Sequence, residues 1–138
     1  MRKTFSALAA IGAAGAMIIS APVAVAKQPV AEKGEARLAK MLDGRVAGKP
    51  QSCIYAPAIN SMTVIDKTAI VIKRGSTLYV NRPANAHDLD SHDMLVINRQ
   101  AHELCRLDSV TMRTQPPHSF FSGAVFLGEF VPYTKSEG

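Results

Sequence analysis

The chain has 138 residues, with 16 lysines and arginines against 11 aspartates and glutamates. A chain of this length buries one modest core, so we expect one domain at most. Residues 50–138 carry eight basic and eight acidic side chains and are neutral overall. Because nucleic-acid binders usually carry a basic patch on their folded body, this distribution argues against nucleic acid as a partner.

Residues 1–26 have the three parts of a secretory signal peptide. The basic start Met1-Arg2-Lys3 is followed by an apolar run over residues 5–19, and Ala24-Val25-Ala26 is the small-x-small pattern of a cleavage point. The apolar run is too short and too rich in small residues for a transmembrane anchor, which needs about 20 strongly apolar residues. We therefore expect an exported protein, periplasmic or secreted, with no transmembrane segment after cleavage.

The stretch PVAEKGEARLAKMLD, residues 29–43, predicts a short amphipathic helix. Ala31, Leu38 and Leu42 share one side of this helix, and three basic side chains share the opposite side. The basic side is interpreted as a solvated face, and the alternative is a face that lies on an anionic membrane surface. Gly34 is expected to weaken the helix.

Residues 27–49 are interpreted as a helix and a linker, in which Asp43-Gly44 ends the helix because glycine readily takes the left-handed conformation there. Residues 50–138 are interpreted as a β-rich domain. Their β-branched and aromatic runs predict about six strands, at residues 62–66, 69–73, 77–81, 94–99, 103–113 and 124–131. This spacing favours an antiparallel sheet or small barrel over alternating α/β units, so the expected fold class is α+β, mostly β.

Cys53 and Cys105 are the two cysteines of the chain. In an oxidising compartment, two thiols in a small domain most often form one disulfide. The alternative is a pair of metal-binding or redox thiols, but their spacing is unlike C-x-x-C. We therefore predict a disulfide, which would close a loop of about 50 residues and stabilise the fold by roughly 4 kcal/mol in the chain-entropy estimate.

The stretch NAHDLDSHDM, residues 85–94, concentrates two histidines and three aspartates. Imidazole and carboxylate together suit Zn²⁺, Ni²⁺, Cu²⁺ or Mn²⁺, which suggests a divalent metal site with ligands from His87, Asp88, Asp90 and His92. If this segment were extended, Asp88, Asp90 and His92 would project to one side. The spacing matches neither an EF-hand loop nor H-E-x-x-H. The alternative interpretation is a solvated connection between two strands.

Catalytic motifs are weak in this sequence. His102 with Glu103, or His92 with Asp93, could form an oriented base, but no serine lies in a G-x-S-x-G pattern. We therefore predict no catalytic residues and no cofactor apart from the possible metal. The expected function is non-enzymatic: a binding or structural module of the cell envelope with an unknown partner.

Five aromatic side chains are concentrated near the C-terminus and are expected to lie mostly in the core: Phe120, Phe121, Phe126, Phe130 and Tyr133. If a run such as Phe120-Phe121 were exposed, it would be the first candidate contact surface.

Five short motifs resemble those of a family of short exported proteobacterial proteins of unknown function: GRVAGKPQSCI, VID, LYVNRP, LCRLDSV and LGEFVPY. The resemblance covers nearly all of the chain after residue 26. Members of that family usually carry four cysteines, of which two match Cys53 and Cys105 and two fall near Ala86 and Val125. The resemblance implies that this chain has lost one disulfide and kept the one between Cys53 and Cys105. It implies no activity.

Overall fold

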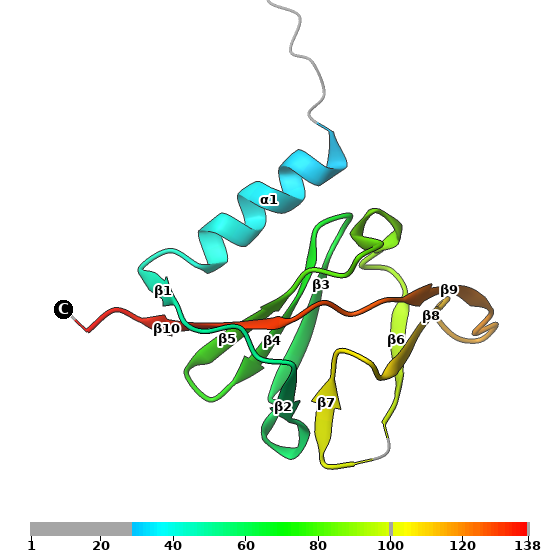
Figure 1. Cartoon of the computed structure of the whole chain (residues 1–138). Coiled ribbons are helices and arrows are strands. Elements are labelled where there is room, and N and C mark those ends of the chain that lie inside the picture. The colour runs from blue at the N-terminus through cyan, green and yellow to red at the C-terminus, as the bar shows by residue number, and fades with distance from the viewer. Residues whose placement is uncertain (1–28, 100, 138) are drawn as a thin grey trace, which may run out of the picture.

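A computed structural model of the protein describes residues 29–99 and 101–137, and the predicted signal peptide, residues 1–26, lies outside them. The described residues form one α-helix, two short 3-10 helices and ten strands (Figure 1). Every strand pairing among them is antiparallel. The predicted fold class, an N-terminal helix followed by antiparallel β-structure, is therefore confirmed.

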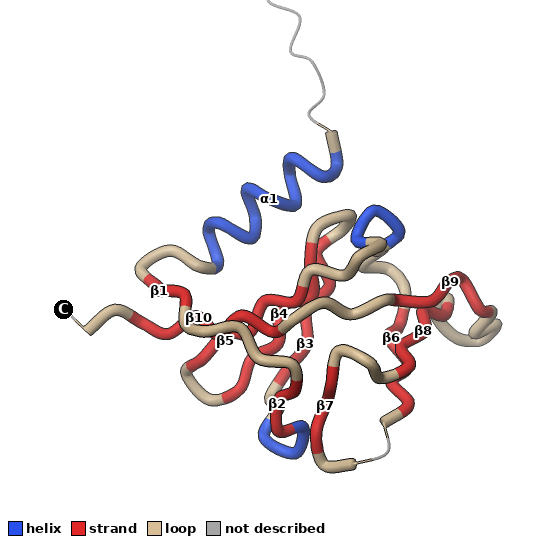
Figure 2. Tube along the Cα trace, viewed as in Figure 1, coloured by secondary structure: helices blue, strands red, loops and turns tan. Residues whose placement is uncertain are grey.

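The strands form three sheets (Figure 2). In spatial order, the five-stranded sheet contains β1 (Arg45–Ala47), β10 (Phe130–Lys135), β5 (Thr77–Asn81), β4 (Ala69–Arg74) and β3 (Ser61–Ile65). The three-stranded sheet contains β6 (Met94–Asn98), β8 (Ser109–Arg113) and β9 (Phe121–Val125). The two-stranded sheet contains β2 (Cys53–Tyr55) and β7 (Glu103–Cys105). The helical segments are α1 (Val30–Met41), η1 (Ala56–Ala58) and η2 (Ala86–Asp88).

Strand β4 is buried on both faces, as its continuous apolar run indicates. Because successive strand side chains point to opposite faces, Ile70 and Ile72 belong to one apolar cluster, which includes residues of the two smaller sheets. Ala69 and Val71 belong to the other cluster, with Leu38 of α1. The five-stranded sheet is therefore a middle layer between α1 and the smaller sheets (Figure 1).

Helix α1 packs on the sheet through Gly34 and Leu38, its two buried residues. A Cβ added to Gly34 would lie only 1.9 Å from Thr68 Oγ1 and 2.7 Å from the Asp66 carbonyl oxygen. The glycine that was expected only to weaken the helix thus permits its close approach to the sheet. Ala31, expected on the apolar side, is exposed.

The segment after α1 differs in part from the predicted linker. The helix ends at Met41, and Gly44 has a φ of 69°, as the predicted helix stop requires. The chain then enters β1, which pairs with β10 at the edge of the main sheet. The three residues of β1 are too few to show a strand periodicity in the sequence. They form a strand only because they pair with β10.

The strand predicted over residues 103–113 is wrong in its length, because a turn divides it into β7 and β8. Asp108 closes this turn: its Oδ2 accepts a hydrogen bond from the Cys105 N–H at 2.7 Å, and its own N–H donates to the Cys105 carbonyl at 3.0 Å. A polar side chain that satisfies the backbone locally offers the chain an alternative to continuing the strand.

The strand predicted over residues 124–131 is also divided, and its second part, β10, continues through Pro132. The division lies near Gly128, whose N–H donates to Asn81 Oδ1 at 3.0 Å and whose carbonyl accepts from Asn81 Nδ2 at 2.7 Å. Asn81 is 0% exposed. One buried side chain thus supplies the hydrogen bonds that a neighbouring strand would otherwise make.

Candidate functional site

The predicted metal ligands lie in the His/Asp loop, residues 87–93, which connects β5 to β6 and is anchored to the rest of the fold. Leu89, in its middle, is 2% exposed and belongs to the larger apolar cluster. The Leu89 carbonyl accepts from the Lys67 N–H at 3.0 Å, and Lys67 Nζ donates to the His87 carbonyl at 2.9 Å. In the sequence, only the lone Leu89 within a polar run indicated that this loop is anchored. Nothing in the sequence indicated that Lys67 contacts the loop.

The four candidate ligands form two separate pairs of neighbours. His92 Nδ1 lies 2.8 Å from Asp90 Oδ1, and His87 Nε2 lies 3.3 Å from Asp88 Oδ1. Asp88, Asp90 and His92 line one hollow of about 340 Å³, and His87 is not among the residues that line it. All four side chains are more than half exposed to solvent. The structure therefore brings three of the four to one hollow without joining them around a common point.

Within the described part of the chain, one trio of His, Cys, Asp or Glu side chains places its ligand atoms within 4.8 Å of one another: Cys53, Glu103 and Cys105. Its two sulfurs form a disulfide, whereas metals bind thiolates, so this trio does not hold a metal. The hollow of the His/Asp loop is lined by three carboxylates and by the ammonium group of Lys67, which offsets part of their attraction for a cation. Metal binding by the His/Asp loop stays a prediction.

Asp90 and His92 change each other's pKa. The Asp90 carboxylate accepts a hydrogen bond from the His92 backbone N–H at 2.8 Å and another from its ring, and these bonds lower the pKa of Asp90. In return, the Asp90 carboxylate raises the pKa of the His92 imidazole. Because metals bind neutral imidazole, a stabilised imidazolium competes with metal binding.

The suggested His92–Asp93 base is arranged differently from the sequence hypothesis. Asp90, not Asp93, faces the His92 ring. The Asp93 carboxylate instead accepts a hydrogen bond from the Ser122 hydroxyl of β9. These contacts join the loop to the three-stranded sheet.

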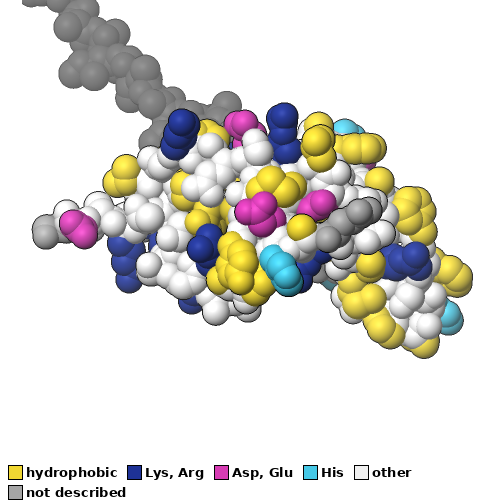
Figure 3. All heavy atoms as spheres, turned by 60° about the horizontal axis from the view of Figure 1, so that its bottom comes forward, with side chains coloured by type: hydrophobic (Ala, Val, Ile, Leu, Met, Phe, Trp, Pro, Cys, Tyr) yellow, Lys and Arg dark blue, Asp and Glu magenta, His cyan; other side chains and the backbone are white. Residues whose placement is uncertain are grey.

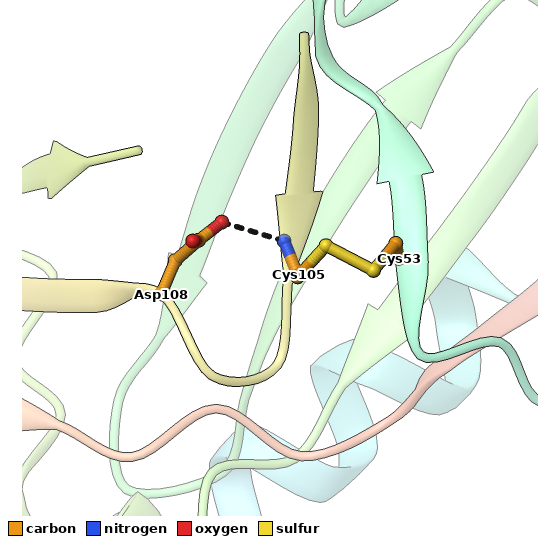
Figure 4. Close-up of a disulfide and its surroundings, with 3 residues drawn as sticks. All are labelled: Cys53, Cys105 and Asp108. Atoms are coloured by element: carbon orange, nitrogen blue, oxygen red, sulfur yellow. Dashed lines mark hydrogen bonds between the residues drawn. A yellow bond between two sulfur atoms is a disulfide. The ribbon is translucent and has the colours of Figure 1, made fainter. Parts of the chain in front are cut away.

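The disulfide between Cys53 and Cys105 links directly facing residues of β2 and β7, whose Cα atoms lie 4.0 Å apart (Figure 4). The predicted pairing is confirmed. The two cysteines are 52 positions apart in the sequence, so the bond closes a long loop. Closing such a loop typically stabilises a small domain by about 2–4 kcal/mol. Figure 4 also shows the bond from the Cys105 N–H to Asp108 that fixes the turn after it.

The three-stranded sheet turns one face to the core and the other to solvent. Its inward side chains are those of Leu95, Ile97, Val110, Met112 and Val125. The register and the two-residue period of a strand place the alternate residues on the outer face. The outer face consists of the rows Met94–Arg113–Phe121 and Val96–Thr111–Ala124, the pair Asn98–Ser109, and Phe126 just beyond β9.

Phe121 belongs to this outer face because of a β-bulge. The register shifts between Met112 and Arg113, so that Phe121, and not Ser122, lies opposite Arg113. Phe121 and Phe126 are each 63% exposed, and Phe120 is 66% exposed. In Figure 3, apolar side chains gather on the lobe where Figure 1 places the β8–β9 end.

The expectation that the C-terminal aromatics lie mostly in the core is therefore wrong for three of the five. Phe130 is fully buried, whereas Phe120, Phe121 and Phe126 are exposed. The physical reasons differ: the turn before β9 exposes Phe120, the bulge places Phe121 on the outer face, and strand alternation turns Phe126 outward because its neighbour Val125 points inward. The exposed run Phe120-Phe121 is thus available as the contact surface that the sequence suggested.

The outer edge of β9 is closed by Asn85. Its side-chain amide donates to the Ala124 carbonyl at 2.8 Å, and its Oδ1 accepts from the Phe126 N–H at 3.0 Å. Unpaired groups of this kind are the ones that recruit an additional strand at a sheet edge. Because Asn85 occupies them, the outer face of the sheet, and not this part of its edge, is open to a partner.

No protein family, curated protein or solved structure matches the chain. The resemblance to short exported proteobacterial proteins therefore stays a prediction. Among the residues that the structure describes, no helix is long and apolar enough to cross a membrane.

Proposed function

We propose that the chain is a small exported binding module of the cell envelope, without catalytic activity, that contacts a protein partner through the outer face of the β6–β8–β9 sheet. The observation that carries the proposal is the exposure of Phe121 and Phe126 at two corners of this partly apolar face. Contiguous exposed apolar patches usually mark interaction sites in soluble proteins.

The shape of the outer face favours a flat apolar surface on the partner. Its central row, Val96–Thr111–Ala124, has short side chains, and phenylalanines flank that row on the β9 side. Sheets pack face to face through interdigitating apolar side chains of this size. A partner that offers an apolar sheet or a similarly flat surface would therefore bury this face.

Charge indicates a partner other than a second copy of the chain. Arg113 is the only charged residue of the outer face, and its Nη1 donates to the Ser119 carbonyl at 3.2 Å. Potentials across an interface are usually complementary, so the partner should bring a carboxylate to Arg113. A second copy meeting the same face would bring none.

Export is supported by two independent features. Residues 1–26 have the composition of a signal peptide. The disulfide between Cys53 and Cys105 is of a kind that persists in oxidising compartments such as the periplasm.

The experiment that tests the proposal is site-specific photo-crosslinking in the native host. A photoreactive residue would replace Phe121 or Val96 on the outer face and, as a control, Lys40 on the exposed side of α1. The two face positions should crosslink one common protein, which the control position does not reach. The same adducts from Lys40, or none from the face, would contradict the proposal.

The crosslinked protein would then be purified and titrated with the wild-type chain and with Thr111→Glu. Thr111 lies at the centre of the outer face, and a carboxylate there would oppose an acidic, apolar partner. We expect about a 100-fold loss of affinity in Thr111→Glu and no change in Lys40→Glu. Equal affinities of the wild type and Thr111→Glu would place the interface elsewhere.

A further inference from the structure

A pocket of about 330 Å³ lies on the inner side of β6, where the three sheets approach one another. The residues that line it come from η1 and its neighbourhood, β3, β6 and β7. Six of them are apolar and one is basic: Ala56, Ile59, Met62, Leu95, Ile97, Leu104 and Arg99. The volume is at the lower end of the range for small-molecule sites, which are concave, mostly apolar and carry a few polar groups.

Arg99 lies on the pocket side of β6 because every second side chain of a strand points to the same face. Leu95 and Ile97 point inward from this strand, and Arg99 follows at the same spacing just beyond its end. Arg99 is exposed, and among the described residues its guanidinium has no hydrogen bond or ion pair. A pocket with six apolar lining residues thus has one cation, the exposed Arg99, and no acidic residue in its lining.

We propose that this pocket binds a small carboxylate with an apolar tail, such as a medium-chain fatty acid. The tail would lie against Ile59, Met62 and Leu95, which are half-buried, and the carboxylate would pair with Arg99. A guanidinium matches a carboxylate through two parallel N–H···O bonds, and one cation balances a monoanion. The volume holds on the order of ten carbon atoms at about 30 Å³ each, the share of a water molecule in the liquid.

This site is independent of the proposed protein contact. The pocket is lined by the inward residues of β6, whereas the protein contact uses the outward ones, such as Val96. A failure of small-molecule binding would therefore leave the outer-face proposal untouched, and the reverse also holds.

Calorimetry with decanoate on the purified, disulfide-bonded protein tests the proposal. Below its micelle-forming concentration, decanoate should bind with one-to-one stoichiometry, and acetate, which lacks the tail, should not. In methyl NMR spectra the shifts should be confined to the apolar residues of the lining, such as Ile59, Met62 and Leu95. Absence of saturable binding, or shifts spread over the side chains around Phe120 and Phe121, would overturn the proposal.

The variant Arg99→Gln removes the charge and leaves the apolar lining intact. It should weaken decanoate binding about tenfold, because a charge-assisted pair is lost, and leave the binding of neutral decanol unchanged. Arg106→Gln is the matched control, since Arg106 is an exposed arginine outside the pocket, and it should bind decanoate as the wild type does. Undiminished decanoate binding by Arg99→Gln would contradict the assignment of Arg99.

Met62→Trp provides a second test, because the larger ring would fill the pocket. This variant should lose both decanoate and decanol binding while its thermal unfolding remains cooperative. If a folded Met62→Trp variant binds decanoate as tightly as the wild type, the ligand lies outside this pocket.

Discussion

At the residue scale, two asparagine side chains replace strand partners. Asn81 bonds both backbone groups of Gly128, and Asn85 bonds the Ala124 carbonyl and the Phe126 N–H. Asn81 lies at the end of β5, and Asn85 lies in the connection that follows. Both form hydrogen bonds with the segment that runs from β9 to β10. Asn81 is fully buried, whereas Asn85 is half-buried. The two are chemically alike and differ mainly in their access to water.

We therefore expect Asn81→Ala to lower the free energy of unfolding by about 2–4 kcal/mol, because the half-buried Gly128 N–H and carbonyl would lose their partners and the fully buried Asn81 side chain would leave a void. Asn85→Ala should cost only about 0.5–1.5 kcal/mol, since water can reach its former partners. Urea unfolding of the two variants measures the difference. If Asn85→Ala lowered the free energy of unfolding more than Asn81→Ala, access to water would not be what determines the loss of stability.

A second residue-scale prediction concerns the pKa values of the Asp90–His92 pair. The pKa of His92 is raised, so the stabilisation by this pair is present below the unfolded-state pKa and is lost as pH rises through the folded value. The pKa of Asp90 is lowered, so its contribution is lost as pH falls through that folded value. In an NMR titration, Asp90→Asn should return the pKa of His92 toward its ordinary value, and the distant Glu35→Gln should not. An unchanged His92 titration in Asp90→Asn would rule out Asp90 as the cause.

At the scale of elements, the most informative neighbours are η2 and β9. Ala86 of η2 packs against the apolar cluster that contains Val125 of β9, and Asn85 joins the backbones of the two segments. The family resemblance places two further cysteines near these two positions. Proximity of these two positions is what a disulfide between them would require, and the loss of such a disulfide from this chain stays a prediction.

The double variant Ala86→Cys/Val125→Cys should form that disulfide when it is purified under oxidising conditions. The bond would constrain the unfolded chain and raise the melting temperature above that of the same variant after reduction. Thiol titration and thermal unfolding measure the two effects, with the two single-cysteine variants as controls. Two titratable thiols in the oxidised double variant would mean that these side chains do not meet as proposed.

At the scale of the whole molecule, β4 is the structural centre. It pairs with β3 and β5 along its two edges and is covered on its faces by the two apolar clusters. The small β6–β8–β9 sheet covers the core with one face and leaves the other to solvent. Stability is thus concentrated in the middle layer, and the proposed contact surface lies at the periphery.

Native-state hydrogen exchange should reflect this arrangement. The amides of Ile70, Val71 and Ile72 should exchange most slowly, with an opening free energy near that of global unfolding. Amides of α1 and of the edge strands β1 and β9 should exchange faster, because they can open without disrupting the middle layer. Slower exchange in α1 than in β4 would contradict the assignment of β4 as the centre.

The predicted helix, most of the strand positions and the fold class depend on local patterns, and the structure bears these out. The cysteine pairing could also be predicted from the sequence, because two cysteines can form only one intramolecular disulfide. The candidate sites were harder to predict from the sequence. The His/Asp loop was visible as a polar run, but its anchor at Leu89 and its neighbour Lys67 come from contacts that no local pattern contains.

An N-terminal helix, a β-rich body and one disulfide could all be predicted from the sequence, because periodicity, turn chemistry and cysteine number are local properties. The exposure of Phe121 to solvent and the place of Arg99 in the lining of an apolar pocket follow from tertiary structure alone. Strand register, the bulge and the meeting of several segments set these features. They depend on pairing between residues far apart in the chain, which local patterns do not specify.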